Sequence, residues 1–163
     1  MALTICKAKL SDVPVVIALR QELAAYHIAF ARRDRKLAPH LHEGSGAVRH
    51  FAALVQKVIK SHKGIVYLAE VNGRPAGYSF AYIKPNPLKP MASRLGCIDD
   101  LYVRKEFRGQ RIGSALTRKT IAWFRGKGIR HLTLNVLEQN RTAQGIYRKW
   151  GFFPLAVKMR KNL

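Results

Sequence analysis

The 163-residue sequence has few acidic side chains: nine Asp and Glu stand against thirty Lys and Arg, for a formal net charge of +21. Folding does not require such an imbalance, so it indicates something about partners, solvent or habitat. Fifteen basic but only two acidic residues fall within 104–163. A positive field there attracts a polyphosphate cofactor, and equally nucleic acid or ribosomes. The basic residues alternate with apolar ones in no long block, which favours the solvated face of a folded domain.

Cysteine is scarce as well, with only Cys6 and Cys97. Two distant cysteines exclude a disulfide framework and a cysteine metal cluster, so we expect both to be reduced and packed. His40 and His42 form a short pair in a charged stretch without a third acidic or thiol ligand. Such a pair is more often solvated, and we predict no metal site.

Long hydrophobic runs are missing too. No apolar segment approaches the roughly 20 residues that span a bilayer, and the N-terminus lacks the plan of a signal peptide. We therefore expect a soluble cytoplasmic protein without a membrane partner. With 48% hydrophobic residues, the chain can build a core as a single domain over residues 1–163.

Hydrophobic periodicity and turn residues predict alternating strands and helices, hence an α/β fold. The expected strands are 3–8, 65–71, 75–83, 95–103, 131–137 and 152–159. Helices are expected after the N-cap Ser11-Asp12, over 48–61 with Gly64 closing it, from the loop near 112 to 124, and over 140–150. Asn72-Gly73 predicts a tight hairpin. The charged stretch 32–46 and the proline-rich stretch 84–90 predict loops.

Residues 98–116 carry the pattern of a strand, a glycine-bearing turn and the start of a helix. A helix N-terminus leaves backbone N–H groups without acceptors and favours an anion there. Gly109 and Gly113 leave room for a phosphate, while Arg108 and Arg111 can add charge-assisted hydrogen bonds. This stretch therefore predicts a phosphate cradle.

Two motifs resemble the acetyl-CoA-dependent N-acetyltransferase (GNAT) superfamily. Residues 108–113 are similar to its pyrophosphate motif Arg/Gln-x-x-Gly-x-Gly/Ala, with Arg111 at the position where glycine is usual. Residues 140–152 match its second element, Asn-x-x-Ala-x-x-x-Tyr-x-x-x-Gly-Phe. Together with the order of the elements, the resemblance covers nearly the whole chain.

The resemblance implies the GNAT fold: a central mixed, mostly antiparallel sheet, splayed near its middle, with helices on both faces and acetyl-CoA or CoA in the opening. It also implies a set of cofactor-binding residues drawn from both motifs and from the strand before the loop. These are Leu101, Tyr102, Val103, Arg108, Gly109, Gln110, Arg111, Ile112, Gly113, Ser114, Asn140, Ala143, Tyr147 and Lys149. In relatives, the residue at Asn140 contacts the pantetheine arm and that at Tyr147 stands near the thioester sulfur.

Attack by an amine on a thioester requires a base for the amine, hydrogen-bond donors for the carbonyl oxygen and a proton for the leaving sulfur. The resemblance implies the backbone of 101–103 as donor and Tyr147 as acid. Asp99 and Asp100 form the only adjacent acidic pair, just ahead of the loop. The resemblance to polyamine acetyltransferases of this superfamily, which have Glu-Asp at the same offset from the loop arginine, makes Asp99 our first choice of base. Strand alternation predicts that only one of the pair faces a given acceptor. The alternative, that both merely pair with local Arg or Lys, stays open.

Cys97 shares a strand face with Asp99, but the superfamily transfers acetyl directly, which favours a packed thiol over a nucleophile. The expected activity is direct acetyl transfer from acetyl-CoA to a primary amine of a small molecule, peptide or protein. A homodimer is expected from family habit alone. The rival reading is a basic module associated with nucleic acid or the ribosome that binds CoA structurally.

Overall fold

Five strands form one mixed sheet in chain order. The computed structural model describes residues 2–31, 34, 44, 46–88 and 93–161, so the predicted His40 and His42 pair lies outside it. The strands are β1 (Leu3–Lys7), β2 (Gly64–Val71), β3 (Arg74–Pro85), β4 (Arg94–Val103) and β5 (Leu132–Leu134). The first four pair antiparallel, whereas β5 runs parallel to β4. This confirms the mixed, mostly antiparallel sheet.

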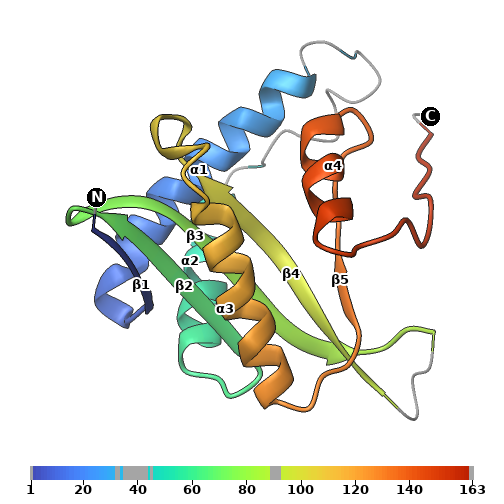
Figure 1. Ribbon diagram of the computed structural model, residues 1–163, viewed down its shortest axis with the longest axis horizontal. Helices are drawn as coiled ribbons and strands as arrows, with labels where there is room; N and C mark the ends of the chain where they lie inside the picture. Colours follow the sequence, from blue (N-terminus) through green and yellow to red (C-terminus); the bar gives the residue numbers. More distant parts are fainter. Residues whose placement is uncertain (1, 32–33, 35–43, 45, 89–92, 162–163) are drawn as a thin grey trace.

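Helices cover both faces of the sheet, as predicted (Figure 1). On one face α1 (Val13–Ala31) and α2 (Ala47–Ile59) bury Val16, Leu19 and Val55 against Tyr78 and Phe80 of β3. On the other face α3 (Ile112–Gly126) packs its apolar side against β2, β3 and β4. The short α4 (Arg141–Lys149) follows β5. The two apolar clusters on opposite faces hold the sheet between the helices.

The splay of the sheet lies between β4 and β5. Only Gly96–Ile98 of β4 pair with Leu132–Leu134, after which β5 ends and the two segments diverge (Figure 1). The strand predicted over 131–137 is therefore shorter than expected. Gly96 sits at this junction because an added Cβ would lie 2.5 Å from Leu132 Cδ2 and 2.7 Å from Phe124 Cε1. The C-terminal half of β4 thus has a free edge on this side within the described residues.

The turns follow the sequence with local differences. Asn72 and Gly73 have φ of 50° and 76° and connect β2 to β3 directly, as expected for a type I′ hairpin. A short 3₁₀ turn, η1 (Leu10–Asp12), leads into α1, and the Asp12 carboxylate accepts from Lys9 N–H at 2.7 Å. Gly64 does not close α2. It opens β2, where a Cβ would lie 2.6 Å from Val58 Cγ1.

The predicted last strand, residues 152–159, is wrong. In the described structure this segment has no strand assignment and no sheet partner, and Phe153, Leu155, Val157 and Met159 are 67–88% exposed. Alternating apolar residues create a strand only where a neighbouring edge supplies hydrogen bonds. The three-residue β5 offers a short edge.

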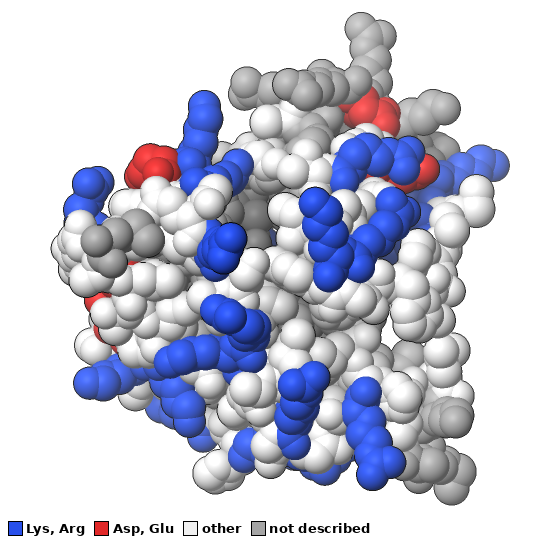
Figure 2. All heavy atoms as spheres, viewed as in Figure 1, with Lys and Arg blue, Asp and Glu red and all other residues white. Residues whose placement is uncertain are grey.

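Basic side chains spread over the face that carries α3 and α4 (Figure 2). Figure 2 shows the molecule from the same side as Figure 1, and acidic side chains on this face are few. The basic excess of residues 104–163 contributes to this face, because these residues build α3, α4 and their connections.

Candidate functional site

A β-bulge on β4 places two carboxylates on the same face of the sheet. Asp100 pairs with Phe80 and Ile98 pairs with Ala81, so Asp99 is the extra residue. Strict alternation predicted that only one of the two faces a given acceptor, and that prediction is wrong, because a bulge rotates one side chain out of the alternation. Both carboxylates lie close enough to Arg20 of α1 to sense its charge.

Asp100 is held by structural partners. Tyr78 donates its hydroxyl to Asp100 Oδ2 at 2.7 Å, and Arg20 Nε lies 3.4 Å from the same oxygen. Tyr78 is fully buried, and burial together with the Asp100 charge raises its pKa well above 10.0. Tyr78 therefore stays protonated and keeps donating. The contacts of Asp100 therefore fit the alternative in which its carboxylate pairs with a nearby arginine.

Asp99 has a different environment. Its side chain reaches solvent, yet partial burial raises its pKa above 3.8, with Lys84 and then Arg20 opposing the shift. Tyr82 and Cys97 lie beside it, and burial followed by the Asp99 charge raises the pKa of Tyr82 well above 10.0. A carboxylate that is accessible and more basic than usual suits a proton acceptor.

The loop between β4 and α3 exposes a run of backbone donors. After a 3₁₀ turn, η3 (Lys105–Phe107), Gly109 has φ of 80° and Arg111 has φ of 61°. Within the described chain, nothing accepts a hydrogen bond from the backbone N–H groups of residues 109–114, and no side chain caps α3. An added Cβ at Gly109 would meet nothing within 4 Å, and one at Gly113 would make only ordinary contacts. This is the arrangement of an anion cradle at a helix N-terminus.

Arg111 stands where the motif usually has glycine, and its backbone explains that preference. Its φ and ψ of 61° and 13° are left-handed, a conformation that side chains with a Cβ rarely adopt. Its side chain is exposed to solvent. Gln110 Nε2 donates to Glu106 O at 3.3 Å, which bridges the cradle to η3.

Arg108 turns back toward the sheet rather than extending over the cradle. Its Nε donates to Val103 O at 2.9 Å, and its guanidinium lies 4.8 Å from the Tyr26 ring centre and 5.8 Å from that of Tyr102. These contacts join the end of β4 to α1. Arg108 fixes the start of the loop in this position, with its remaining N–H groups at an exposed edge.

A second contact ties the same strand end to α1. Arg104 donates from Nε and Nη2 to the Glu22 carboxylate at 2.7–3.1 Å and from Nη1 to Pro75 O at 2.9 Å. The Tyr102 hydroxyl donates to Glu22 Oε2 at 3.2 Å. A bidentate pair of this kind restricts orientation as well as distance. Glu22 of α1 thus holds Tyr102 and Arg104, at the end of the strand that leads into the cradle.

The second motif builds the other side of the splay. Asn140, 8% exposed, caps α4 by accepting from Ala143 N–H at 3.1 Å. Tyr147 packs against Trp150 and Phe152, with ring centres 5.8 and 6.2 Å apart. Burial, followed by the negative charge of Asp100, raises the pKa of Tyr147 above 10.0. The tyrosine on α4 therefore senses the carboxylate on β4 across the opening.

The remaining predicted contacts lie around this opening. Leu101, Tyr102 and Val103 occupy the part of β4 that has lost β5 as a neighbour. Ile112 is buried beneath the cradle and Ser114 is half-buried in the first turn of α3. Lys149 is exposed in the last turn of α4, next to the exposed Arg148. The structure thus brings both motifs to the two sides of the splay.

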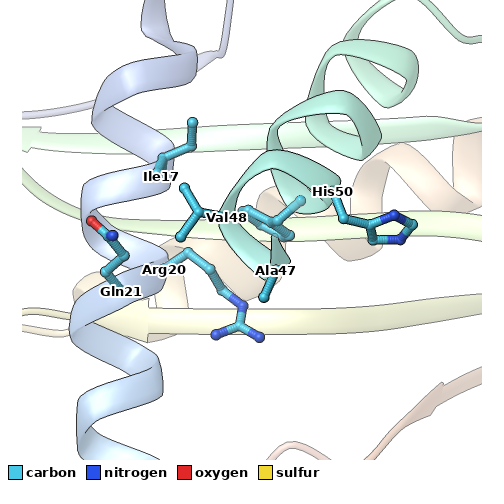
Figure 3. A pocket seen from close by; sticks show the side chains of 7 residues that line it. Ile17, Arg20, Gln21, Ala47, Val48 and His50 are labelled. Atoms are coloured by element: carbon cyan, nitrogen blue, oxygen red, sulfur yellow. The ribbon is translucent and has the colours of Figure 1, made fainter. Parts of the chain in front are cut away.

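A small hollow of about 180 Å³ lies between α1 and α2 (Figure 3). Arg20 points into the space between the two helices, and the same side chain contacts Asp100 and stacks 5.4 Å from the Phe51 ring centre. The hollow therefore borders the face that carries the two carboxylates. Its lining consists of Ile17, Arg20, Gln21, Ala47, Val48, His50 and Phe51.

Other candidate chemistry is weak. Cys97 is 1% exposed and burial raises the pKa of its thiol, which confirms a packed cysteine. Cys6 is exposed, so the prediction of packing is wrong there, because it lies on the edge strand β1. In the ranges that the structure describes, no three His, Cys, Asp or Glu side chains group as a metal site. No described helix has the length and apolarity needed to cross a bilayer.

Sequence reasoning missed Glu22, Arg104, Tyr78, Arg20 and Tyr26. Glu22 and Arg104 are 82 residues apart, and Tyr78 and Asp100 are 22 apart. No local pattern links such pairs. A weak signal exists for Glu22, since it is the only acidic residue in α1.

Comparison with known proteins agrees with this geometry. A profile of the Acetyltransferase (GNAT) family matches residues 19–152. The chain is 32% identical over 93 residues to a putative [ribosomal protein bS18]-alanine N-acetyltransferase of Bacillus subtilis. The aligned residues make up 57% of this chain and 55% of that protein. It is 27% identical over 150 residues to thialysine N-epsilon-acetyltransferase of Bos taurus, covering 89% and 81%. The chain thus spans about half the length of the Bacillus relative.

Solved structures share the fold. A tetramutant of the BH1408 protein from Bacillus halodurans superposes with a TM-score of 0.79 at 19% identity, covering 98% of this chain and 99% of that one. The aminoglycoside N-acetyltransferase AAC(6')-Iy, solved in complex with CoA, gives 0.75 at 16% identity, covering 99% and 96%.

Proposed function

Because the chain belongs to the Acetyltransferase (GNAT) family, we propose that it transfers acetyl from acetyl-CoA directly to a primary amine of a small molecule, peptide or protein. The observation that carries the proposal is the run of N–H groups at residues 109–114, beside the splay that separates Asp99 from Tyr147. Backbone donors without acceptors fit a pyrophosphate, and the open space at Gly109 permits its approach.

The residues around the splay divide the chemistry between them. Acetyl-CoA, when bound, supplies an acetyl group activated as a thioester. Asp99 accepts a proton from the incoming ammonium, for which its accessibility and raised pKa suit it. Backbone N–H groups on the free edge of β4, within residues 101–103, donate to the carbonyl oxygen.

Tyr147 completes the set from α4. Its raised pKa keeps the hydroxyl protonated at neutral pH, so it holds the proton needed by the leaving sulfur. Asn140, held in place as the cap of α4, and the half-buried Ala143 line the same side for the pantetheine arm. Lys149 and Arg148 provide positive charge at the end of α4 for the remaining phosphate.

The acceptor approaches from the face of α1 and α2. Both carboxylates and the hollow beside Arg20 lie on this face, opposite α3. The relatives' names mention an alanine of ribosomal protein bS18, thialysine and an aminoglycoside, and molecules of these kinds carry primary amines. None of these relatives is described as a nucleic-acid-binding module that lacks catalysis, which gives the rival reading no support. The homodimer and the cytoplasmic location stay predictions.

Calorimetry with CoA and a thiol-release assay test the proposal together. The amine panel contains lysine, thialysine, a peptide with N-terminal alanine, a polyamine and an aminoglycoside. We expect heat on CoA addition and release of free thiol with at least one amine class. Asp99→Asn is the matched control, which should bind CoA normally but turn over slowly. No heat with CoA and no thiol release with any amine would refute the function.

A further inference from the structure

The outer side of α3 carries a regular row of cations. Arg111, Arg118 and Arg125 are exposed and seven residues apart, and Lys119 lies next to the middle one. Seven residues make nearly two turns, so Arg118 and Arg125 project on one side of the helix about 10 Å apart, and Arg111 lies at its N-terminal end. Lys119 Nζ donates a hydrogen bond to Ile5 O at 2.6 Å.

Among the residues that the structure describes, the cations along α3 have no acidic partner. In the described parts of the chain, no carboxylate lies within ion-pair distance of Arg118, Lys119 or Arg125. Basic side chains extend beyond α3 over the same face of the molecule (Figure 2). After α3, the exposed basic residues of the described chain are Arg130, Arg141, Arg148, Lys149, Lys158, Arg160 and Lys161. The face therefore presents positive charge over several elements.

The proposed cofactor does not account for these cations. The pyrophosphate cradle uses the residues at the N-terminal end of α3, at 109–114. Arg118 and Arg125 lie about 10 and 20 Å further along the helix axis. They also stand on the α3 face, whereas the acceptor face carries α1 and α2. Acetyl transfer therefore leaves Arg118, Lys119 and Arg125 unused.

A lipid surface fits the row poorly. A helix that lies in a membrane interface inserts an exposed apolar side. The large exposed apolar residues of the described chain include none from α3, because its apolar side is buried on the sheet. The arginine row offers phosphate contacts without an apolar wedge. Aromatic platforms for stacking unpaired bases are also missing from its exposed side.

We infer that this face of α3 binds the phosphate backbone of a double-stranded nucleic acid, without reading its bases. Arginine suits phosphate because its planar guanidinium can donate two parallel hydrogen bonds. Each exposed cation of this row can neutralise one backbone phosphate and release its counterion, which is the sequence-independent term in duplex binding. The surface would hold the enzyme near acceptors in a nucleic-acid-containing assembly, while its catalysis on free amines is independent of it.

Anisotropy titrations with labelled 20-base-pair RNA and DNA duplexes, from 50 to 200 mM KCl, test the inference. The double variant Arg118→Gln/Arg125→Gln is compared with Lys57→Gln/Lys60→Gln, two exposed lysines on and just after α2 on the opposite face. Both variants lose two positive charges. Two lost phosphate contacts lower the slope of log K against log salt by about 1.8 and weaken binding about fiftyfold at 0.1 M salt.

We expect this loss only in the α3 variant, while Arg118→Lys/Arg125→Lys keeps the salt slope. Thiol release with a small amine should be unchanged in all three, which separates this inference from the proposed catalytic function. Equal losses in the α2 and α3 variants would overturn the assignment to α3. Absence of duplex binding at 50 mM KCl, or equally tight binding to phosphatidylserine vesicles or polyglutamate, would overturn the choice of partner.

Discussion

Replacing Arg111 by glycine, the residue usual at this position of the motif, should stabilise the protein. The left-handed conformation of Arg111, with φ of 61°, costs a residue with a Cβ about 1–2 kcal/mol. Glycine avoids that cost but makes the unfolded chain more flexible, which offsets about 0.5–1 kcal/mol. The net gain is about 0.5–1 kcal/mol, or roughly 1–4 °C in Tm for a chain of this length. Thermal and urea unfolding of the ligand-free protein measure it.

Two matched variants separate the backbone effect from the lost charge. Arg111→Ala removes the same guanidinium but keeps the Cβ, so its Tm should stay near that of the parent. Arg118→Gly makes the same substitution inside the regular part of α3, where glycine costs about 1 kcal/mol relative to alanine. If Arg111→Gly lowers the Tm as Arg118→Gly does, the left-handed assignment and the strain argument are refuted.

Three further predictions concern the site. Asp99→Asn should lower kcat/KM about 10²–10⁴-fold and remove the acidic limb of its pH profile, which lies above pH 3.8 because the pKa of Asp99 is raised. A raised carboxyl pKa contributes stability at low pH that is lost as pH rises through it, so this variant should not melt earlier at pH 7; an earlier melt contradicts the burial argument. Tyr147→Phe should lower kcat about 10²-fold or more at unchanged Tm, because the ring contacts with Trp150 and Phe152 remain; an unchanged kcat excludes it as the acid. Glu22→Gln should weaken CoA binding by calorimetry about twofold to fivefold at unchanged kcat, a modest effect because its side chain is 37% exposed; a fall in kcat alone would contradict a positioning role.

Local signals predicted most of the fold. Asn72-Gly73 required a two-residue turn with positive φ, and the apolar periods of α1, α2 and α3 matched the faces they bury. The last strand, 152–159, failed because pairing depends on an available edge rather than on alternation. The sequence predicts Gly64 as the end of a helix, whereas it is the first residue of β2. A glycine between a helix and a β-rich run has the same local pattern whether it ends the helix or begins the strand.

The site was predictable in its parts and not in its arrangement. The glycine-bearing turn, the cap residue Asn140 and the acidic pair all stand in short patterns. The bulge that turns Asp99 and Asp100 to one face arises from the register of β3 against β4, which no single strand displays. The same holds for the inward turn of Arg108, whose partners Tyr26 and Tyr102 come from different elements.

Residues that are near neighbours in the chain were enough to predict most helices and strands, the donor-rich loop at 109–114 and the excess of positive charge. Tertiary structure decided which of two carboxylates is accessible, what anchors the loop and on which face the cations gather. Those outcomes depend on contacts such as the one between Glu22 and Arg104, which are 82 residues apart. Such contacts form only once the folded sheet has brought distant segments together.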